Sequence, residues 1–158
     1  GPATAIRIHT LPVPRPGPRE VLLALEAAGV GGWDETVGGG SWKRGGRTRF
    51  PLVHGTDGAG IVVAKGARVR RLRVGDRAYG YEPFNAKGGF YAEYIAIADK
   101  SLAPVPRRLD LLHAGAGAVT ALTAQQGIDR AGGRRVPLSP DAHHPEQKRN
   151  AATHQSQS

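Results

Sequence analysis

The run FPLVHGTDGAGIV, residues 50–62, comes nearest in this chain to a ligand site, because three glycines surround the polar Thr56–Asp57 step. Glycine-rich turns hold phosphates through backbone N–H groups when they follow a strand and open a helix, in the pattern G-x-G-x-x-G. Here the pattern is G-x-x-G-x-G, and it leads into AGIVV, which predicts a strand. We therefore expect these glycines to allow a close crossing of strands or a bulge, not to hold a phosphate.

A second glycine cluster, GAGAVT at 115–120, also lacks the setting of a phosphate site, because no β-branched strand precedes it and a threonine replaces the third glycine. A metal site is no better supported. The chain has no cysteine, and its histidines are dispersed apart from the pair His143–His144 in a polar C-terminal stretch, which offers a metal no preorganised geometry. We expect neither a nucleotide-binding fold nor a bound metal.

The formal net charge is +9, and the basic residues are densest in KGARVRRLRVGDR, residues 65–77, where arginines alternate with Val69, Leu72 and Val74. This pattern favours a strand with solvated arginines. A nucleic-acid partner has less support, because the run contains no aromatic residue for base stacking. No apolar run reaches the roughly 20 residues of a membrane helix, and the N-terminus lacks the features of a secretory signal. We expect a cytoplasmic protein without a membrane or nucleic-acid partner.

The elements that position these residues are short, because glycine and proline divide the chain into small β-rich runs. Short β-rich runs separated by glycine and proline are typical of a β-barrel or a β-sandwich. The sequence predicts one helix at 107–128, with Asp110 as a candidate N-cap and two glycines that weaken it. It predicts strands at residues 4–11, 20–30, 59–66, 77–81, 90–98 and 101–105.

Three stretches fall outside these elements. The connector PVPRPGP, residues 12–18, is too rich in proline for the interior of a helix or strand, so we expect it to be extended. The glycine-rich loop 37–50 carries Trp42, which we expect to form a lid over a cleft or a pocket wall. Residues 129–158 are polar and broken by proline, and we expect them to form a disordered tail behind a domain at 1–128.

Four stretches in fixed order, PVPRPGPREVLLALEAAGV, FPLVHGTDGAGIVVAKGARV, RLRVGDRAYGY and GGFYAEYIAI, resemble the medium-chain dehydrogenase/reductase superfamily. They are similar to its GroES-like catalytic domain, especially in the zinc-independent quinone oxidoreductase and enoyl reductase branch. The resemblance implies a mainly β fold, a partly open GroES-like barrel with a few short helices. It also implies that the Rossmann nucleotide-binding domain is absent and that the family's first strand is missing ahead of Gly1-Pro2, a pair that could equally be a cleavage scar.

The resemblance implies NADPH as the cofactor and hydride transfer to a quinone, an enone or a related carbonyl compound. Zinc-dependent relatives carry a His-Glu pair where this chain has Thr56–Asp57, and a metal-binding cysteine where it has Gly31, so we expect no metal. Three residues fall beside the cofactor: Gly31, where relatives usually have asparagine, Thr36 and Thr123. Four fall in or near the substrate pocket: Trp42, Thr56, Asp57 and Tyr81. No residue is identified as a general acid.

A second interpretation belongs to another class of function. A GroES-like domain without its nucleotide domain could act as a non-catalytic binding or interaction module. Barrel surface that the nucleotide domain normally covers would then be exposed and would favour self-association. In either case we expect the isolated chain to be inactive or weakly active as a reductase.

Overall fold

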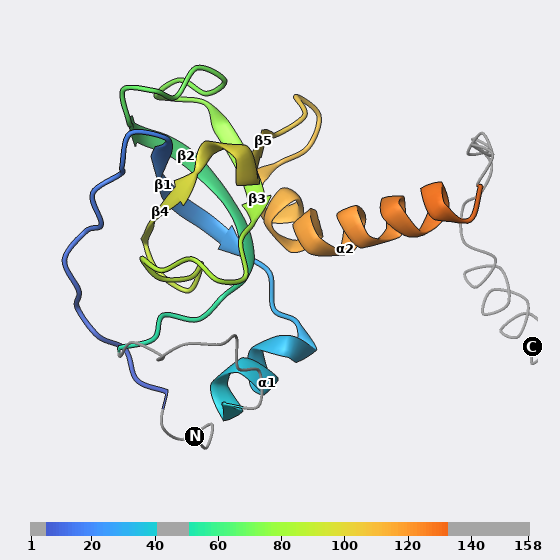
Figure 1. Ribbon diagram of the computed structural model, residues 1–158, viewed down its shortest axis with the longest axis horizontal. Coiled ribbons are helices and arrows are strands. Elements are labelled where there is room, and N and C mark those ends of the chain that lie inside the picture. The colour runs from blue at the N-terminus through green and yellow to red at the C-terminus, as the bar shows by residue number, and fades with distance from the viewer. Residues whose placement is uncertain (1–5, 41–50, 133–158) are drawn as a thin grey trace, which may run out of the picture. The chain divides into compact units, whose positions relative to one another are not determined.

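Five antiparallel strands form one sheet in the order β4-β1-β2-β3-β5 (Figure 1). The computed structural model describes residues 6–40 and 51–132. Its elements are β1 (Glu20–Ala28), α1 (Gly32–Gly39), β2 (Asp57–Lys65), β3 (Arg77–Tyr81), β4 (Tyr94–Ala98), a 3₁₀ helix (Asp99–Ser101), β5 (Leu102–Pro104) and α2 (Leu111–Arg130). The edge strands β4 and β5 do not pair with each other. The predicted mainly β, open fold is therefore confirmed.

The chain divides into two units, Gly1–Gln126 and Gly127–Ser158, and the first contains the whole sheet. Among the described residues, neither unit contains the alternating strands and helices of a Rossmann fold. The division into a domain at 1–128 and a disordered tail stays a prediction, because residues 133–158 lie outside the described part of the chain.

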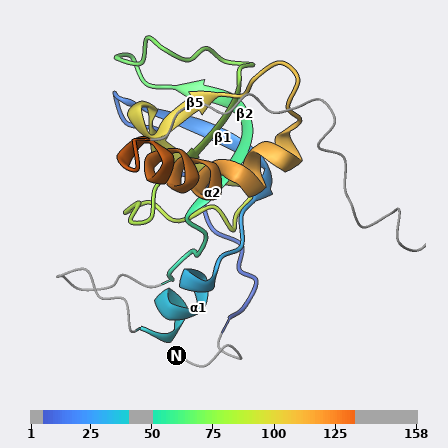
Figure 2. The same cartoon turned by 90° about the vertical axis from the view of Figure 1, so that its right-hand side faces the viewer.

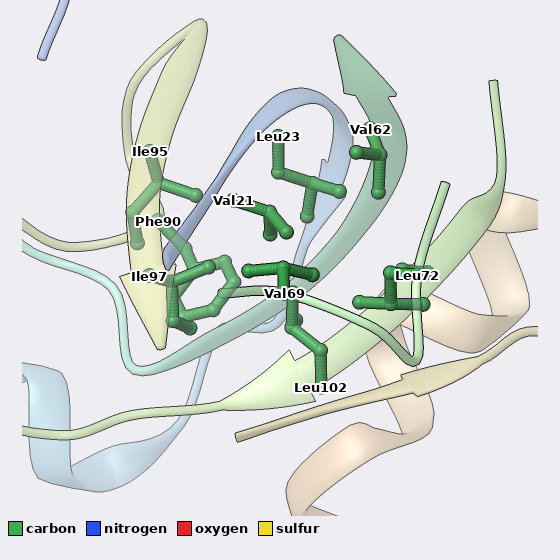
Figure 3. Packing of buried hydrophobic residues seen from close by; sticks show 10 residues of the cluster. Val21, Leu23, Val62, Val69, Leu72, Phe90, Ile95, Ile97 and Leu102 are labelled. Atoms are coloured by element: carbon green, nitrogen blue, oxygen red, sulfur yellow. The ribbon is translucent and has the colours of Figure 1, made fainter. Parts of the chain in front are cut away.

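The main core lies on one face of the sheet and is built by side chains that alternate along the strands (Figure 3). In β1, Val21 and Leu23 are fully buried while their neighbours are only partly so. Burying such a side chain contributes about 1.5–3 kcal/mol. The cluster contains Val21, Leu23, Val62, Val69, Leu72, Ala78, Phe90, Ile95, Ile97 and Leu102.

A second cluster places the start of α2 against the opposite face of the sheet. Ala59 of β2 packs with Leu111 and Ala114 of α2, and Val105 completes the buried set. The helix begins at Leu111, later than predicted, because Leu109 N–H bonds to Pro106 O in a turn (3.0 Å). The predicted N-cap is confirmed, since His113 N–H donates to Asp110 Oδ1 at 2.8 Å.

Of the strand that the sequence predicts at 4–11, residues 6–11 are described, and they form no strand. Residues 6–11 are exposed, with Ile8 fully so. Their apolar alternation suits a strand, but a strand needs a neighbour to share its backbone hydrogen bonds. None of the five described strands pairs with this segment.

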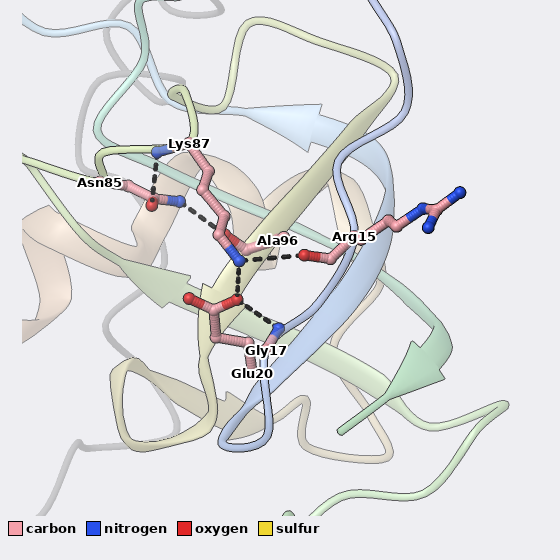
Figure 4. Close-up of polar contacts among 6 residues, drawn as sticks. All are labelled: Arg15, Gly17, Glu20, Asn85, Lys87 and Ala96. Carbon is pink, nitrogen blue, oxygen red and sulfur yellow. Dashed lines mark hydrogen bonds and ion pairs between the residues drawn. The ribbon is translucent and has the colours of Figure 1, made fainter. Parts of the chain in front are cut away.

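The proline-rich connector forms neither helix nor strand over residues 12–17, and one lysine ties it to the sheet (Figure 4). Lys87 Nζ donates to Arg15 O at 2.9 Å and forms an ion pair with Glu20 at the start of β1. Glu20 Oε2 also accepts the Gly17 N–H at 2.6 Å. This network fixes the entry of the chain into the central strand.

The strand predicted at 90–98 is shorter than expected and begins at Tyr94. The preceding residues take part in a different contact, because the Phe90 N–H donates to Gly55 O at 3.0 Å and the Tyr91 N–H donates to His54 O at 2.8 Å. These bonds fasten the segment before β4 across the segment before β2.

Helix α1 was not predicted, because its sequence GWDETVGG is half composed of poor helix formers. It is held at its start by Asp34, whose Oδ2 accepts the Gly31 N–H at 2.8 Å. It ends at Gly40, whose φ of 81° is the left-handed conformation of a helix C-terminus.

The arginine-rich run is a loop, not the predicted strand, because β2 ends at Lys65 and β3 begins at Arg77. Val69 and Leu72 anchor the loop in the main core, with exposed fractions of 0% and 1%. The arginines of the loop itself, Arg68, Arg70, Arg71 and Arg73, are exposed, as expected. Two buried residues three apart are too few to sustain the two-residue period of a strand.

Candidate functional site

The glycines around the Thr56–Asp57 step bring three backbone segments into contact. Gly55 has a φ of 92°, in the region that favours glycine, and a Cβ there would lie 2.7 Å from Tyr91 N. A Cβ at Gly58 would lie 2.6 Å from Ala27 O in β1. The prediction of a close crossing of strands is confirmed.

This crossing buries two polar side chains at the start of β2, Thr56 and Asp57, with exposed fractions of 4% and 3%. From α1, the indole Nε1–H of Trp33 donates to Thr56 Oγ1 at 2.8 Å. The Thr56 hydroxyl donates in turn to Asp57 Oδ1 at 3.1 Å. The three side chains therefore form one chain of hydrogen bonds that ends on a buried carboxylate.

Asp57 joins this chain to two further elements. Its Oδ2 accepts the Val119 N–H of α2 at 3.3 Å, and its backbone carbonyl accepts the Gly29 N–H at 3.0 Å. Burial raises the pKa of Asp57, the bonds from Val119 and Thr56 oppose that rise, and the negative charge of Asp34 adds to it. Asp57 thus acts as a cross-link between β2, α2 and the segment after β1.

A second polar group lies beside the first and is centred on Tyr91. The Tyr91 hydroxyl lies 2.9 Å from Asp34 Oδ2 and 3.1 Å from Gly29 O. Burial, followed by the hydrogen bond to Asp34 and the charges of Asp34 and Asp57, raises the pKa of Tyr91 far above its usual value. The side chain is therefore a neutral phenol at any physiological pH.

The structure brings three of the predicted pocket residues together. Tyr81, at the end of β3, is the cross-strand partner of Asp57, and Thr56 precedes Asp57. Burial raises the pKa of Tyr81, and the charges of Asp57 and Glu82 raise it further. Their assignment to a substrate pocket stays a prediction.

The predicted cofactor-side residues are dispersed. Gly31 is the N-cap of α1, next to the polar groups, and its N–H is occupied by Asp34. Thr36 on α1 and Thr123 on α2 are both exposed. Trp42 lies outside the described residues. The roles of these four residues stay predictions.

Sequence reasoning missed Trp33, Asp34 and Tyr91. A signal for the first two was present, because an aspartate three residues after a glycine, ahead of Glu35, is typical of the first turn of a helix. Tyr91 had no local signal, since its partners Gly29 and Asp34 lie about 60 residues away in the sequence. A hollow of about 230 Å³ opens beside Tyr91 and is lined by residues 25–28 and 90–92.

The sequence of this fold matches a known family over most of the sheet. Residues 17–107 match the model of the alcohol dehydrogenase GroES-like domain. The chain belongs to this family. It lies in the medium-chain dehydrogenase/reductase superfamily, in the quinone oxidoreductase-like branch, as the sequence predicted.

Similar proteins place the GroES-like domain among oxidoreductases. The chain is 33% identical over 116 residues to a quinone oxidoreductase from Lama guanicoe, covering 73% of this chain and 34% of that protein. It is 46% identical over 68 residues to alcohol dehydrogenase 1 from Neurospora crassa, covering 43% of this chain and 19% of that protein. Mycobacterial Rv1454c complexed with NADPH superposes with a TM-score of 0.72 at 27% identity, covering 88% of this chain and 40% of that one. The chain thus spans about a third of the curated quinone oxidoreductase.

The described residues suit neither a metal ion nor, at the first turn of α1, a phosphate group. Residues 6–40 and 51–132 contain no group of three histidine, cysteine, aspartate or glutamate side chains that could hold a metal ion. The first turn of α1 is unsuited to phosphates, because Asp34 and Glu35 give it negative charge and Asp34 occupies the Gly31 N–H. These residues therefore do not fit the diphosphate of a dinucleotide.

Within the described residues, neither helix combines the length and the apolar character that crossing a bilayer requires.

Proposed function

We propose that this chain provides the substrate-side wall of a reductase that uses NADPH, without a metal, to reduce a quinone, an enone or a related carbonyl compound. The observation that carries the proposal is the hydrogen-bond chain from Trp33 through Thr56 to Asp57 and Val119. At the positions of Thr56 and Asp57, zinc-dependent relatives are expected to carry a His-Glu pair. Here both side chains are occupied by the protein itself, which supports a structural role in place of metal binding.

NADPH, when bound, supplies the hydride, and the protein orients the acceptor and excludes water. Two residues of this chain suit that task. Trp33 is half-buried and held by its indole N–H, and Tyr91, 40% exposed, is a neutral phenol held against Asp34. Aromatic rings fixed in this way offer a rigid, apolar wall to a flat acceptor such as a quinone.

We expect the isolated 158-residue chain to have little or no reductase activity. The first turn of α1 does not suit the phosphates of the nucleotide, so we expect the described residues not to hold the nicotinamide in place. Correct positioning of two reactants is worth roughly 7–11 kcal/mol of the barrier. A chain that does not hold the nicotinamide loses most of that contribution.

A chimaera tests the proposed reaction. Residues 1–128 replace the matching N-terminal part of the Lama guanicoe quinone oxidoreductase, and NADPH oxidation by benzoquinone is followed in the presence of EDTA. We expect EDTA-resistant turnover. A folded chimaera that binds NADPH but does not reduce benzoquinone would contradict the proposal, as would activity that EDTA abolishes. The unaltered Lama guanicoe enzyme is the control.

Binding without catalysis is the second candidate function, and the exposed part of α2 favours it. Residues 120–126 are exposed throughout, and Leu122 is 46% exposed although it is a large apolar residue. Light scattering of the isolated chain over a range of concentrations measures self-association. Together with the activity of the chimaera, it distinguishes the two functions. Self-association with an inactive, folded chimaera would support the interaction module.

A further inference from the structure

One end of the sheet carries a dense group of cations that the proposed reductase site does not use. It consists of the turn before β1, the last residue of β2 with the loop between β2 and β3, and the 3₁₀ helix after β4. These segments are neighbours, because the Arg68 N–H donates to Pro18 O (2.8 Å) and the Asp99 N–H donates to Arg19 O (3.0 Å). Figures 1 and 2 show the β2–β3 loop and the start of β1 at one end of the sheet and α1 at the other.

We call this surface the arginine face and define it by Arg19, Lys65, Arg68, Arg70, Arg71, Arg73 and Lys100. The same segments contain seven cations but only two carboxylates outside ion pairs, those of Asp76 and Asp99. The carboxylate of Glu20 is already neutralised by Lys87. The face therefore carries a strong excess of positive charge.

The arginines of this face keep their charge uncompensated. Arg71 donates to two backbone carbonyls, those of Asp99 and Leu102, and Arg70 donates to Ala67 O. For the guanidinium groups of Arg19, Arg68 and Arg73, the described residues provide no hydrogen bond and no carboxylate partner. Arg19 and Arg68 line the same hollow of about 380 Å³.

The loop that presents these arginines is fixed in place. Val69 and Leu72 are buried in the core, and Lys65 Nζ donates to the carbonyl oxygens of both, at 3.2 and 3.3 Å. The Gly75 N–H donates to Val62 O at 2.8 Å and closes the loop. Because the backbone of this loop is already held in place, binding an anion costs little backbone conformational entropy.

We propose that the arginine face binds the phosphate backbone of duplex nucleic acid. This departs from the expectation drawn from the sequence, which rested on the lack of aromatic residues that stack on unpaired bases. A repeated anion suits a surface that spans three segments, and arginine matches phosphate oxygens through its planar fork. Among the described residues of the face no aromatic side chain is present for base stacking, which favours a duplex backbone over an unpaired strand. Val74 is its one large exposed apolar residue, so the face lacks the apolar side chains that insert into a membrane surface.

The test is fluorescence anisotropy of a labelled 20-base-pair DNA duplex with the full 158-residue chain, over a range of salt concentrations. We expect a micromolar dissociation constant at low salt. The logarithm of the association constant should fall linearly with the logarithm of the salt concentration. The triple variant R19Q/R68Q/R73Q should make the salt slope shallower by about 3, close to one for each lost phosphate contact. The variant R19K/R68K/R73K keeps the charges and should retain most of the slope.

A matched pair of single variants locates the binding surface. R68Q and R130Q each remove one exposed arginine, but Arg130, at the end of α2, belongs to the second unit and is not among the residues that define the arginine face. We expect R68Q to weaken duplex binding severalfold and R130Q to leave it unchanged. Equal losses would show attraction to net charge alone and would overturn the proposal. Binding to phosphatidylserine vesicles without binding to the duplex would also overturn it.

Discussion

The indole Nε1 of Trp33 lies 2.8 Å from Thr56 Oγ1, and this hydrogen bond joins α1 to the start of β2. Thr56 donates in turn to Asp57, so the indole helps to fix the orientation of a buried carboxylate. The strength of that connection can be measured directly.

A double-mutant cycle with Trp33→Phe and Thr56→Val measures the bond. We expect a coupling energy of about 1 kcal/mol, the usual net contribution of one hydrogen bond in a folded protein. Urea unfolding of the parent chain, both single variants and the double variant provides the four free energies. Strictly additive effects would show that the indole and the hydroxyl do not stabilise one another.

The pH dependence of stability should report the state of Asp57. Burial, its largest influence, raises its pKa above the ordinary 3.8, so the folded state binds its proton more tightly than the unfolded state. Its contribution to stability is therefore full below pH 3.8 and is lost as the pH rises through the higher folded value. We expect the unfolding free energy of the parent chain, minus that of Asp57→Asn, to fall as the pH rises from below 3.8 to neutrality. A difference that rises with pH would contradict this assignment.

Glu20 should show the opposite dependence. Burial acts to raise its pKa, but the hydrogen bonds from Lys87 and Gly17 and the charge of Lys87 outweigh burial and hold the pKa below the ordinary 4.5. Its contribution is present above pH 4.5 and is lost as the pH falls through the folded value. Since Glu20 and Lys87 are 26% and 38% exposed, we expect Glu20→Gln to cost only about 0.5 kcal/mol at neutral pH.

Salt provides the check on the Glu20 result. Screening weakens a partly exposed ion pair, so the cost of Glu20→Gln should shrink in 1 M NaCl, where the Debye length is about 3 Å. Thermal unfolding of both proteins at low and high salt measures this. A cost that does not depend on salt would assign the effect to the hydrogen bond from Gly17 instead.

The sheet could be predicted from the sequence because its signals are local. The runs that form β1, β2 and β3 are short, largely apolar and bounded by glycine or proline, and their predicted positions match within two residues. The segment at 4–11 has the same local signal but no described neighbour, and pairing is not a property that one segment can encode.

The polar groups of the site could be predicted only in part. Thr56 and Asp57 were identified because glycines mark their position, and the resemblance to zinc-dependent relatives drew attention to the same step. Trp33 was overlooked because the glycines around it conceal a helix whose stability comes from its first-turn cap and from tertiary contact. Trp42, the tryptophan that the sequence assigns to a lid or pocket wall, lies outside the described residues.

A pair of glycine substitutions tests the close crossing of β1 and β2. At Gly60 in β2, an added Cβ would overlap the backbone oxygen of Ala24 in β1, and backbone cannot move aside as a flexible side chain can. We expect Gly60→Ala to destabilise the chain by about 3 kcal/mol, the upper end of the usual cost of overpacking. Gly117 in α2 is the control, because a Cβ there meets nothing within 4 Å and alanine is the better helix former by about 1 kcal/mol. Urea unfolding should show the first variant weakened and the second unchanged or strengthened, whereas equal shifts would mean that the strands do not approach as closely as this structure shows.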